Sequence, residues 1–319
     1  MKSITHRHIV LTFVLILAIA PSTVLAAEKL TVMLDWFVNP DHGPLIVAQQ
    51  KGFFEDAGLD VELIAPANPN DPPKLVAAGK VDIAVSYQPQ LVVQVAAGLP
   101  LTRIGTLVAT PLNSLVVLAD GPVHSIADLR GRKIGFSVGG FEDALLSAML
   151  RRYGLSLDDV SLVNVNFSLS PSIVSGQVDA VIGAFRNFEL NQMDIVGRPG
   201  LAFYVEEHGV PAYDELIFVA NRERLGDPRL HAFISAIEQS VQFIVNHPQQ
   251  SWEAFIASDP ALDDELNRRA WRDTLPRFAL RPAALDRGRY HRFAVFLQQQ
   301  GLLEEIPVLD SYAVDLGAD

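Results

Sequence analysis

The chain has 319 residues, of which 25 are Lys or Arg and 37 are Asp or Glu, so its formal net charge is -12, and 49% of its residues are hydrophobic. This length and apolar content suit two units with cores of their own and exclude intrinsic disorder. The absence of cysteine excludes disulfides, thiolate metal sites, iron–sulfur clusters, thiol nucleophiles and a lipid-modified cysteine. The acidic balance offers no basic surface to a phosphate backbone, so nucleic acid is not an expected partner.

Residues 1–26 have the layout of a cleaved secretory signal peptide. Lys2 and Arg7 precede an apolar run over 9–20, and Pro21 and small residues up to Ala26 follow it. This run of 12 residues is too short to span a bilayer, which takes about 20 apolar residues. We therefore expect a soluble periplasmic protein that is cleaved after Ala26 and has no lipid anchor. A retained membrane anchor is the alternative.

From residue 29 to residue 118, short apolar strands alternate with helices that end at glycines. The expected strands are 29–34, 59–64, 81–86, 101–108 and 114–118. The expected helices are 44–57, 71–78 and 89–97, which stop at Gly58, Gly79 and Gly98. This alternation predicts a mostly parallel sheet with helical crossovers.

The pattern restarts after the turn Asp120-Gly121-Pro122. The strands expected in this second part are 133–137, 161–166 and 180–183, and the helices are 142–152 and 171–175. The tail from 228 to 303 is expected to be mostly helical, because apolar residues recur in it at helical spacing.

One stretch occurs twice in similar form. Residues 76–85 read Val-Ala-Ala-Gly-Lys-Val-Asp-Ile-Ala-Val, and residues 173–182 read Ile-Val-Ser-Gly-Gln-Val-Asp-Ala-Val-Ile. Each copy is a helix end, a tight turn and a buried strand, which is common in α/β proteins and also fits two similar lobes. We assign residues 27–118 and 216–319 to lobe 1 and residues 119–215 to lobe 2. Ligands of open α/β sheets bind beyond the carboxyl ends of strands, so the site is expected in the cleft between the lobes.

Polar and aromatic residues follow the expected strands at this cleft. Asp35, Trp36, Asn39 and His42 come after the first strand and combine a stacking face with hydrogen-bonding groups, as a flat heteroaromatic ligand requires. The alternative is structural, with a half-buried Trp36 and a solvated His42 in a turn. The other residues expected to line the cleft are Ser86, Tyr87, Asn113, Gly139, Phe185 and Glu189. Among these, Glu189 is either an acceptor for a ring amino group or an ordinary helix carboxylate.

Gly139 lies in the loop over 137–141, whose backbone N–H groups could cradle an anion. Glu142 and Asp143 follow in the first helical turn and already complement the helix dipole, so the loop is expected to form a wall of the cleft rather than an anion site. Sequence motifs of hydrolases, phosphate-binding loops and zinc proteases are absent from the chain, and its eight histidines do not cluster. We expect no catalytic residue, no metal and no cofactor.

Four segments carry a family resemblance, namely 34–42, 87–90, 137–144 and 181–189. Together they resemble the periplasmic binding proteins of thiamine-pyrimidine ABC transporters, over about residues 30–310. The resemblance implies a two-lobed type II binding fold and a ligand such as hydroxymethylpyrimidine or its N-formyl-aminomethyl relative, salvaged from degraded thiamine.

This resemblance also implies roles for single residues and for partners. Trp36 is implied to stack on the pyrimidine, Glu189 to meet its amino edge, and Asn39, Tyr87 and Phe185 to line the cleft. The implied partners are the permease and ATPase subunits of an importer at the inner membrane. A monomer is expected.

Two alternatives stay open. One is a binding protein for a sulfonate, nitrate or other small anion, against which Glu142 and Glu189 weigh. The other is the related pyrimidine synthase of yeasts, for which the resemblance implies a lysine-linked pyridoxal phosphate, a histidine donor and a cysteine-rich iron motif. Residues 85–90 contain neither Lys nor His, and the chain has no Cys, so the sequence weighs against this enzyme.

Overall fold

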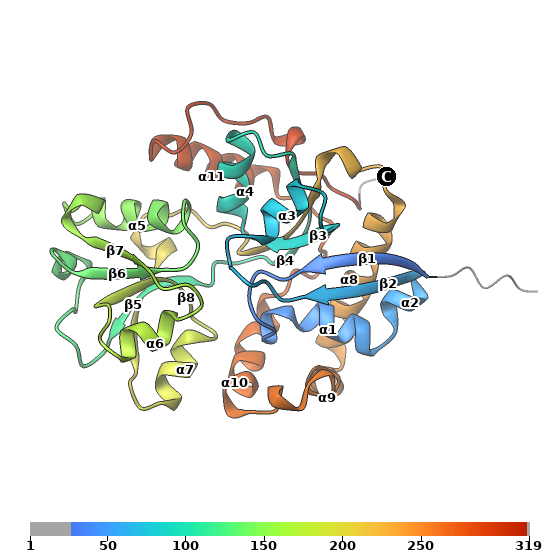
Figure 1. Cartoon of the computed structure of the whole chain (residues 1–319), viewed down its shortest axis with the longest axis horizontal. Helices are drawn as coiled ribbons and strands as arrows, with labels where there is room; N and C mark the ends of the chain where they lie inside the picture. The colour runs from blue at the N-terminus through green and yellow to red at the C-terminus, as the bar shows by residue number, and fades with distance from the viewer. Residues whose placement is uncertain (1–26, 318–319) are drawn as a thin grey trace, which may run out of the picture.

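The computed structural model describes residues 27–317, and the expected signal peptide over 1–26 lies outside the described residues. Two five-stranded sheets lie side by side, each flanked by helices (Figure 1). Within the described part of the chain, no helix is long and apolar enough to cross a membrane. The prediction of a two-lobed α/β fold is confirmed.

The first sheet has the strand order β2-β1-β3-β10-β4. Its strands are β1 (Glu28–Met33), β2 (Leu59–Ile64), β3 (Ile83–Ser86), β4 (Leu101–Val108) and β10 (Leu216–Asn221). The helices between them are α1 (Gly43–Gln50), α2 (Phe53–Asp56), α3 (Pro72–Ala77) and α4 (Gln88–Ala96). β1 pairs in parallel with β2 and β3, whereas β10 is antiparallel to both of its neighbours because the chain re-enters this sheet from the second one.

The second sheet has the equivalent order β7-β6-β8-β5-β9. Its strands are β5 (Asn113–Leu118), β6 (Lys133–Phe136), β7 (Ser161–Asn164), β8 (Ala180–Phe185) and β9 (Gly200–Tyr204). Its helices are α5 (Glu142–Arg151), α6 (Leu169–Val174) and α7 (Glu189–Ile195). Here β5 is the antiparallel strand, so each sheet consists of three parallel strands, then one reversed strand, and a fifth strand at the far edge.

β5 corrects the lobe boundary drawn at residue 118. We expected the strand at 114–118 in lobe 1, but β5 pairs with β8 and β9 of the second sheet. The chain crosses between the lobes over residues 109–112, directly after β4. Two apolar strands joined by so short a connection look like a hairpin in the sequence, so the crossing carries no local signal.

The repeated stretch lies at equivalent places in the two sheets. Both β3 and β8 are the third strand of their sheet, and each copy includes an aspartate just before its strand. Asp82 accepts hydrogen bonds from the backbone N–H and the hydroxyl of Thr31 in β1, both at 2.9 Å. Asp179 accepts from the N–H of Lys133 in β6 at 2.9 Å. The recurring Val-Asp pair therefore joins neighbouring strands at the ends away from the cleft.

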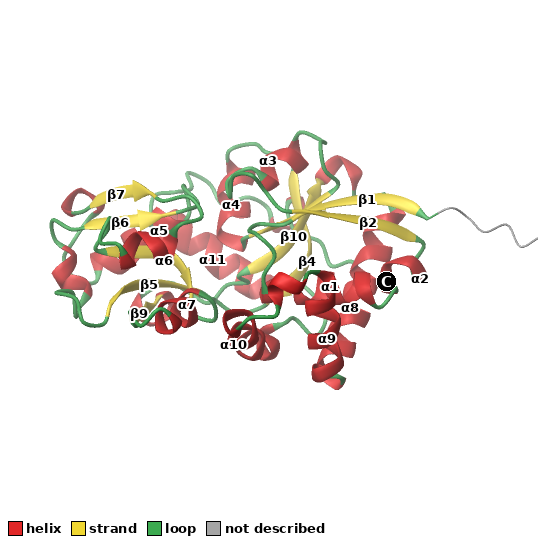
Figure 2. Cartoon of the chain, turned by 60° about the horizontal axis from the view of Figure 1, so that its bottom comes forward, coloured by secondary structure: helices red, strands yellow, loops and turns green. Residues whose placement is uncertain are grey.

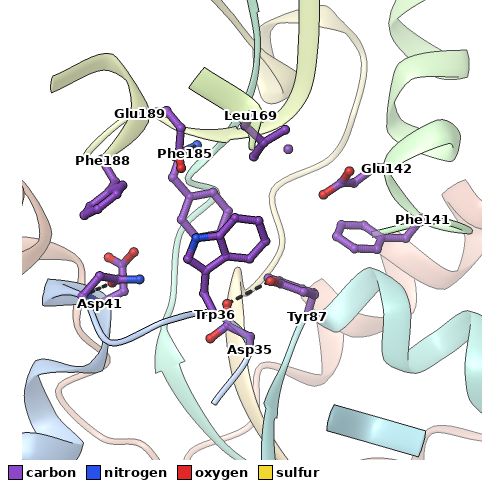
Figure 3. A pocket seen from close by; sticks show the side chains of 12 residues that line it. Asp35, Trp36, Asp41, Tyr87, Phe141, Glu142, Leu169, Phe185, Phe188 and Glu189 are labelled. Atoms are coloured by element: carbon purple, nitrogen blue, oxygen red, sulfur yellow. Dashed lines mark hydrogen bonds between the residues drawn. The ribbon is translucent and has the colours of Figure 1, made fainter. Parts of the chain in front are cut away.

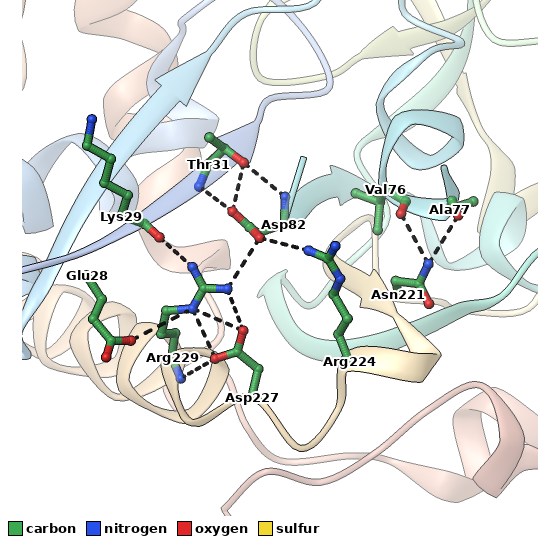
Figure 4. A network of polar contacts seen from close by, with 10 residues as sticks. All are labelled: Glu28, Lys29, Thr31, Val76, Ala77, Asp82, Asn221, Arg224, Asp227 and Arg229. Carbon is green, nitrogen blue, oxygen red and sulfur yellow. Dashed lines mark hydrogen bonds and ion pairs between the residues drawn. The ribbon is translucent and has the colours of Figure 1, made fainter. Parts of the chain in front are cut away.

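Asp82 also anchors the helical tail to the first sheet (Figure 4). Arg224 and Arg229 approach its carboxylate to 3.3 and 3.5 Å, and Arg229 also pairs with Asp227 at 2.5 Å. The tail consists of α8 (Pro228–Asn246), α9 (Pro248–Ser258), α10 (Glu265–Thr274) and α11 (Arg287–Gln299), as its periodicity predicts. α8 and α9 pack on α1, while α10 lies against α7 of the second lobe (Figure 2).

Several elements differ from their predicted form. The helix expected over 44–57 is divided into α1 and α2 by Gly52, whose φ of 77° is left-handed. The sequence did not predict α7, β9 or β10. β10 is an ordinary apolar strand, but an antiparallel strand that returns from another lobe has no place in a simple strand–helix alternation.

Candidate functional site

A pocket lies between the lobes, where the carboxyl ends of β1 and β3 face those of β6 and β8 (Figure 3). The lobes pack closely around it, and its cavity volume is about 30 Å³. The residues that line it are Asp35, Trp36, Asn39, Asp41, Tyr87, Phe141, Glu142, Leu169, Gly183, Phe185, Phe188 and Glu189. Both lobes contribute to this set, so the complete pocket exists only when they are together.

Two aromatic pairs join the lobes around the pocket. Trp36, which follows β1, meets Phe167 of the second lobe edge-on with ring centroids 4.6 Å apart. Tyr87, which follows β3, stacks on Phe141 at 5.0 Å. Only 8% of Trp36 is exposed, and it packs in the apolar cluster of the second lobe with Leu169. The lobes are therefore closed over the pocket.

His42 positions a pocket residue and is itself fully buried outside the lining. Its Nδ1 accepts from the backbone N–H of Asn39 at 3.3 Å, so its Nε2 carries the proton and donates to Oδ1 of Asp35 at 2.9 Å. The other carboxylate oxygen of Asp35 accepts from the hydroxyl of Tyr87 at 2.8 Å. This chain of hydrogen bonds fixes the orientation of the Tyr87 ring at the pocket wall.

The turn after β1 places Asn39 and Asp41 in the lining. The Asn39 side chain accepts from the N–H of Asp41 at 2.8 Å and donates to the carbonyl of Phe37 at 3.1 Å, so it caps the short 3-10 helix Pro40–His42. Burial raises the pKa of Asp41 to about 6. Its Oδ1 accepts from Asn187 of the second lobe at 2.6 Å.

Glu189 and Glu142 are two buried carboxyls from the second lobe. Glu189 begins α7 and accepts from the N–H of Phe185 at 2.7 Å. Glu142 begins α5 and accepts from the N–H groups of Ser137 and Val138 at 2.8 and 3.1 Å. Burial is the main cause that raises the pKa of each to about 8. Both carboxyls therefore hold a proton at neutral pH when the pocket is empty.

The structure brings Asp35, Trp36, Asn39, Tyr87, Phe185 and Glu189 of the predicted set into the lining. The other four lie elsewhere. His42 is placed as described above, and Ser86 donates to Gln90 at 3.0 Å in the core. Asn113 accepts from the N–H of Gly183 at 3.1 Å, and Gly139 donates to Asn70 at 3.1 Å near the surface.

Six lining residues were not predicted as site residues, namely Asp41, Phe141, Glu142, Leu169, Gly183 and Phe188. The loop before α5 does form a wall of the pocket, as expected, but through Phe141 and Glu142 rather than through Gly139. Phe188 stands next to a predicted residue. Leu169 has no signal in the sequence, because an apolar residue that starts a helix looks like any core residue.

The chemistry of the lining is aromatic and acidic. It contains four carboxyls and no Lys, Arg or His. Such a pocket suits a flat neutral or cationic ligand and disfavours an anion. It does not fit pyridoxal phosphate, because it offers neither a lysine amine for an imine nor a basic group for the phosphate. No cluster of three or more potential metal ligands occurs within residues 27–317.

Two α/β lobes that close on a pocket at their strand ends define the type II fold of periplasmic binding proteins. The structure resembles the alkanesulfonate-binding protein SsuA from Xanthomonas axonopodis pv. citri bound to MOPS, with a TM-score of 0.70 and 17% identity over 90% of this chain and 99% of that one. It also resembles the CA3427 gene product of Candida albicans, with a TM-score of 0.71 and 18% identity over 91% and 97%. Residues 39–251 match the family described as NMT1/THI5 like, and the chain belongs to this family.

Three relatives of this chain bear three kinds of name. A protein of Haemophilus influenzae named for thiamine biosynthesis is 56% identical over 91% of this chain and 93% of its own length. The formylaminopyrimidine-binding protein of Halalkalibacterium halodurans is 35% identical over 76% and 73%. The 4-amino-5-hydroxymethyl-2-methylpyrimidine phosphate synthase THI13 of Saccharomyces cerevisiae is 26% identical over 76% and 75%.

Proposed function

We propose that this chain is the periplasmic solute-binding component of an ABC importer and that it binds a thiamine-derived aminopyrimidine. The observation that carries the proposal is that Trp36 and the buried carboxyl of Glu189 line the same pocket, which has no basic side chain in its lining. A flat ring needs an aromatic face, and its amino edge needs an acceptor that water does not reach. The name of the relative with 35% identity supports the same ligand class.

Glu189 recognises the amino edge through one shared proton. Its carboxyl has a pKa of about 8, so it enters the encounter protonated at neutral pH. When the carboxyl passes this proton to a ring nitrogen, it accepts from both that nitrogen and the exocyclic amino group. The resulting charge-assisted pair stays neutral as a whole, which is how a buried ion pair avoids the cost of an isolated charge.

Closure of the lobes completes the site. Trp36 and Tyr87 come from the first lobe, and Glu189 and Phe141 come from the second, so a ligand that contacts both sets favours the closed form. A bound and closed protein is the form that the permease of an importer would receive. The expected N-terminal signal peptide supports a periplasmic location for this exchange.

Calorimetric titration of the purified protein with 4-amino-5-hydroxymethyl-2-methylpyrimidine and with its N-formyl-aminomethyl relative tests the proposal. We expect saturable binding in the micromolar range or tighter, and weaker binding of the matched pyrimidine that lacks the amino group. The absence of binding up to millimolar ligand would overturn the proposal.

Two other functions can be tested with the same purified protein. The similarity of the fold to SsuA suggests sulfonate binding as one alternative, but a lining with four carboxyls and no Lys, Arg or His opposes it. A thermal-shift screen with alkanesulfonates should therefore show no stabilisation. Because the yeast relatives are named as synthases, an enzymatic function is the second alternative. Incubation with pyridoxal phosphate should then give no more imine absorbance than the exposed lysines of the chain produce, because the pocket contains no lysine.

A further inference from the structure

The two carboxyl oxygens of Glu142, which lines the pocket, have different surroundings. Only 3% of the residue is exposed. Its Oε2 accepts both backbone hydrogen bonds, from Ser137 and Val138, whereas its Oε1 has no hydrogen-bond partner among the described residues. Figure 3 shows this carboxyl at the pocket, to the right of the Trp36 ring, whereas Glu189 lies above the ring. One oxygen is thus committed to the fold and the other is free for a ligand.

The position of Oε1 depends on Gly183 in β8. A Cβ atom at this glycine would lie 2.4 Å from Oε1, so a side chain there would displace the carboxyl. Gly183 also has a φ of 97°, which L residues rarely adopt. Its backbone N–H is held by Asn113 at 3.1 Å. The strand therefore leaves a space that the Glu142 carboxyl fills.

The surroundings of Glu142 favour its neutral form. The groups that face it are Asp143 on its own helix, Glu215 before β10 and the Tyr87 hydroxyl before α4, and the pocket adds three further carboxyls. No basic side chain lines the pocket to balance them. Burial and the charges of Asp143 and Glu215 raise the pKa of Glu142 to about 8. Because Oε2 already accepts two N–H groups, the proton sits on Oε1.

We propose that Glu142 is a ligand-contacting specificity residue that donates a hydrogen bond from Oε1 to an acceptor oxygen on the ring substituent. The inference rests on the proposed function, since it assumes that an aminopyrimidine occupies this pocket with its amino edge at Glu189. It assigns the ligand a substituent with a carbonyl or hydroxyl oxygen, such as N-formyl-aminomethyl or hydroxymethyl. An aminomethyl substituent is an ammonium group at neutral pH and has only donors to offer.

Two substitutions separate a neutral donor from a carboxylate. In Glu142→Gln, the amide oxygen can accept from Ser137 and Val138 while the amide NH₂ replaces the Oε1–H donor. We expect this variant to bind the N-formyl-aminomethyl pyrimidine within about threefold of wild type at pH 7, and Glu142→Leu to bind it about tenfold more weakly. If Glu142→Gln loses as much affinity as Glu142→Leu, Glu142 acts as a carboxylate and the inference is overturned.

A pH series provides a second readout that a purely structural role would not change. Above about pH 8, wild type should lose affinity more steeply than Glu142→Gln, because only in wild type does Oε1 of Glu142 lose a proton in addition to Glu189. Glu189 and the ligand titrate equally in both proteins, so the difference between the two profiles isolates Glu142. Parallel profiles would overturn the inference, and this comparison holds even if Glu142→Leu fails to fold.

The ligand series separates failure of the inference from failure of the proposed function. Wild type should bind the hydroxymethyl and N-formyl-aminomethyl pyrimidines more tightly than the aminomethyl pyrimidine. Preference for the aminomethyl ligand would overturn the role of Glu142 and leave the aminopyrimidine site standing. Binding of none of the three by wild type would instead overturn the proposed function itself.

Discussion

Asn187 of the second lobe donates a hydrogen bond to Asp41 of the first lobe across 2.6 Å, at the wall of the pocket. Both side chains are buried, and Thr274 of α10 donates to the same carboxyl oxygen at 3.1 Å. A second cross-lobe pair nearby, Asn191 and Asp273, spans 2.8 Å in an exposed position. The closed form is thus held by polar contacts of unequal burial as well as by aromatic packing.

Asn187→Ala should weaken ligand binding by about fivefold, because the closed form loses a buried hydrogen bond and leaves the Asp41 carboxyl with one partner fewer. Asn191→Ala is the matched control, and we expect less than a twofold effect because water replaces its exposed bond. Calorimetric titration of both variants checks this. Equal effects would show that burial of the Asn187 pair does not contribute to closure.

Trp36→Ala should weaken aminopyrimidine binding by about 1–3 kcal/mol if the indole stacks on the ring, without unfolding the protein. Fluorescence offers a direct check. Of the three tryptophans in the chain, only Trp36 lines the pocket, while Trp252 and Trp271 pack together at 5.8 Å on α9 and α10. A ligand-induced change in emission should occur in wild type and disappear in Trp36→Phe. Unchanged affinity in Trp36→Ala would leave Trp36 with a structural role alone.

The free energy of unfolding of the empty protein should fall as the pH rises from 5.5 to 8.5. Glu142 and Glu189 have a pKa near 4.5 when unfolded and about 8 when folded, so the folded state binds more protons throughout this window. The loss should reach about 2 kcal/mol or more. Carboxyls with a lowered pKa, such as Asp227, titrate below 3.8 and do not contribute here.

Chemical denaturation at several pH values measures this slope. The double variant Glu142→Gln with Glu189→Gln is the control, and its stability should vary less over the same range. A stability that increases from pH 5.5 to 8.5 in wild type would mean that both carboxyls are ionised in the folded protein.

Gly183→Ala should destabilise the fold and reduce ligand affinity together, because the new Cβ meets the Glu142 carboxyl. Gly176 is a suitable control, since its φ of 75° is also left-handed but a Cβ there has no atom within 4 Å. Gly176→Ala should cost about 1–2 kcal/mol of backbone strain and leave affinity unchanged. Gly183→Ala should cost about 1–3 kcal/mol more. Thermal unfolding and ligand titration of both variants separate backbone strain from displacement of the Glu142 carboxyl. Equal losses of stability and affinity in the two variants would contradict the contact between Gly183 and Glu142.

Much of the fold could be predicted from local patterns, and the exceptions share a cause. The strands that precede the cleft and the glycine stops follow from apolar runs and left-handed turns, which are local properties. The placement of β5 in the second sheet depends instead on a crossing over 109–112 that has no composition of its own. Long-range pairing of this kind cannot be read from neighbouring residues.

The candidate site also contains residues that local patterns predict and residues that they do not. Trp36, Tyr87 and Phe185 could be placed because they follow strands that end at the cleft. His42 faces away from the pocket because its two ring nitrogens are already used by Asn39 and Asp35. Ser86 and Asn113 likewise form hydrogen bonds within the protein, to Gln90 and to the N–H of Gly183. Whether a polar side chain turns toward a ligand or toward its own chain depends on partners that are distant in the sequence.

The aromatic pairs Trp36–Phe167 and Tyr87–Phe141 join rings that the two lobes hold separately. Each lobe alone presents half of the pocket lining, so under the proposed function a ligand that contacts both halves favours one relative orientation of the two lobes. Under the proposed function, a partner that touches both lobes can recognise this orientation from outside, without any contact with the bound ligand. Chemical recognition inside the pocket and mechanical recognition outside it can then evolve independently.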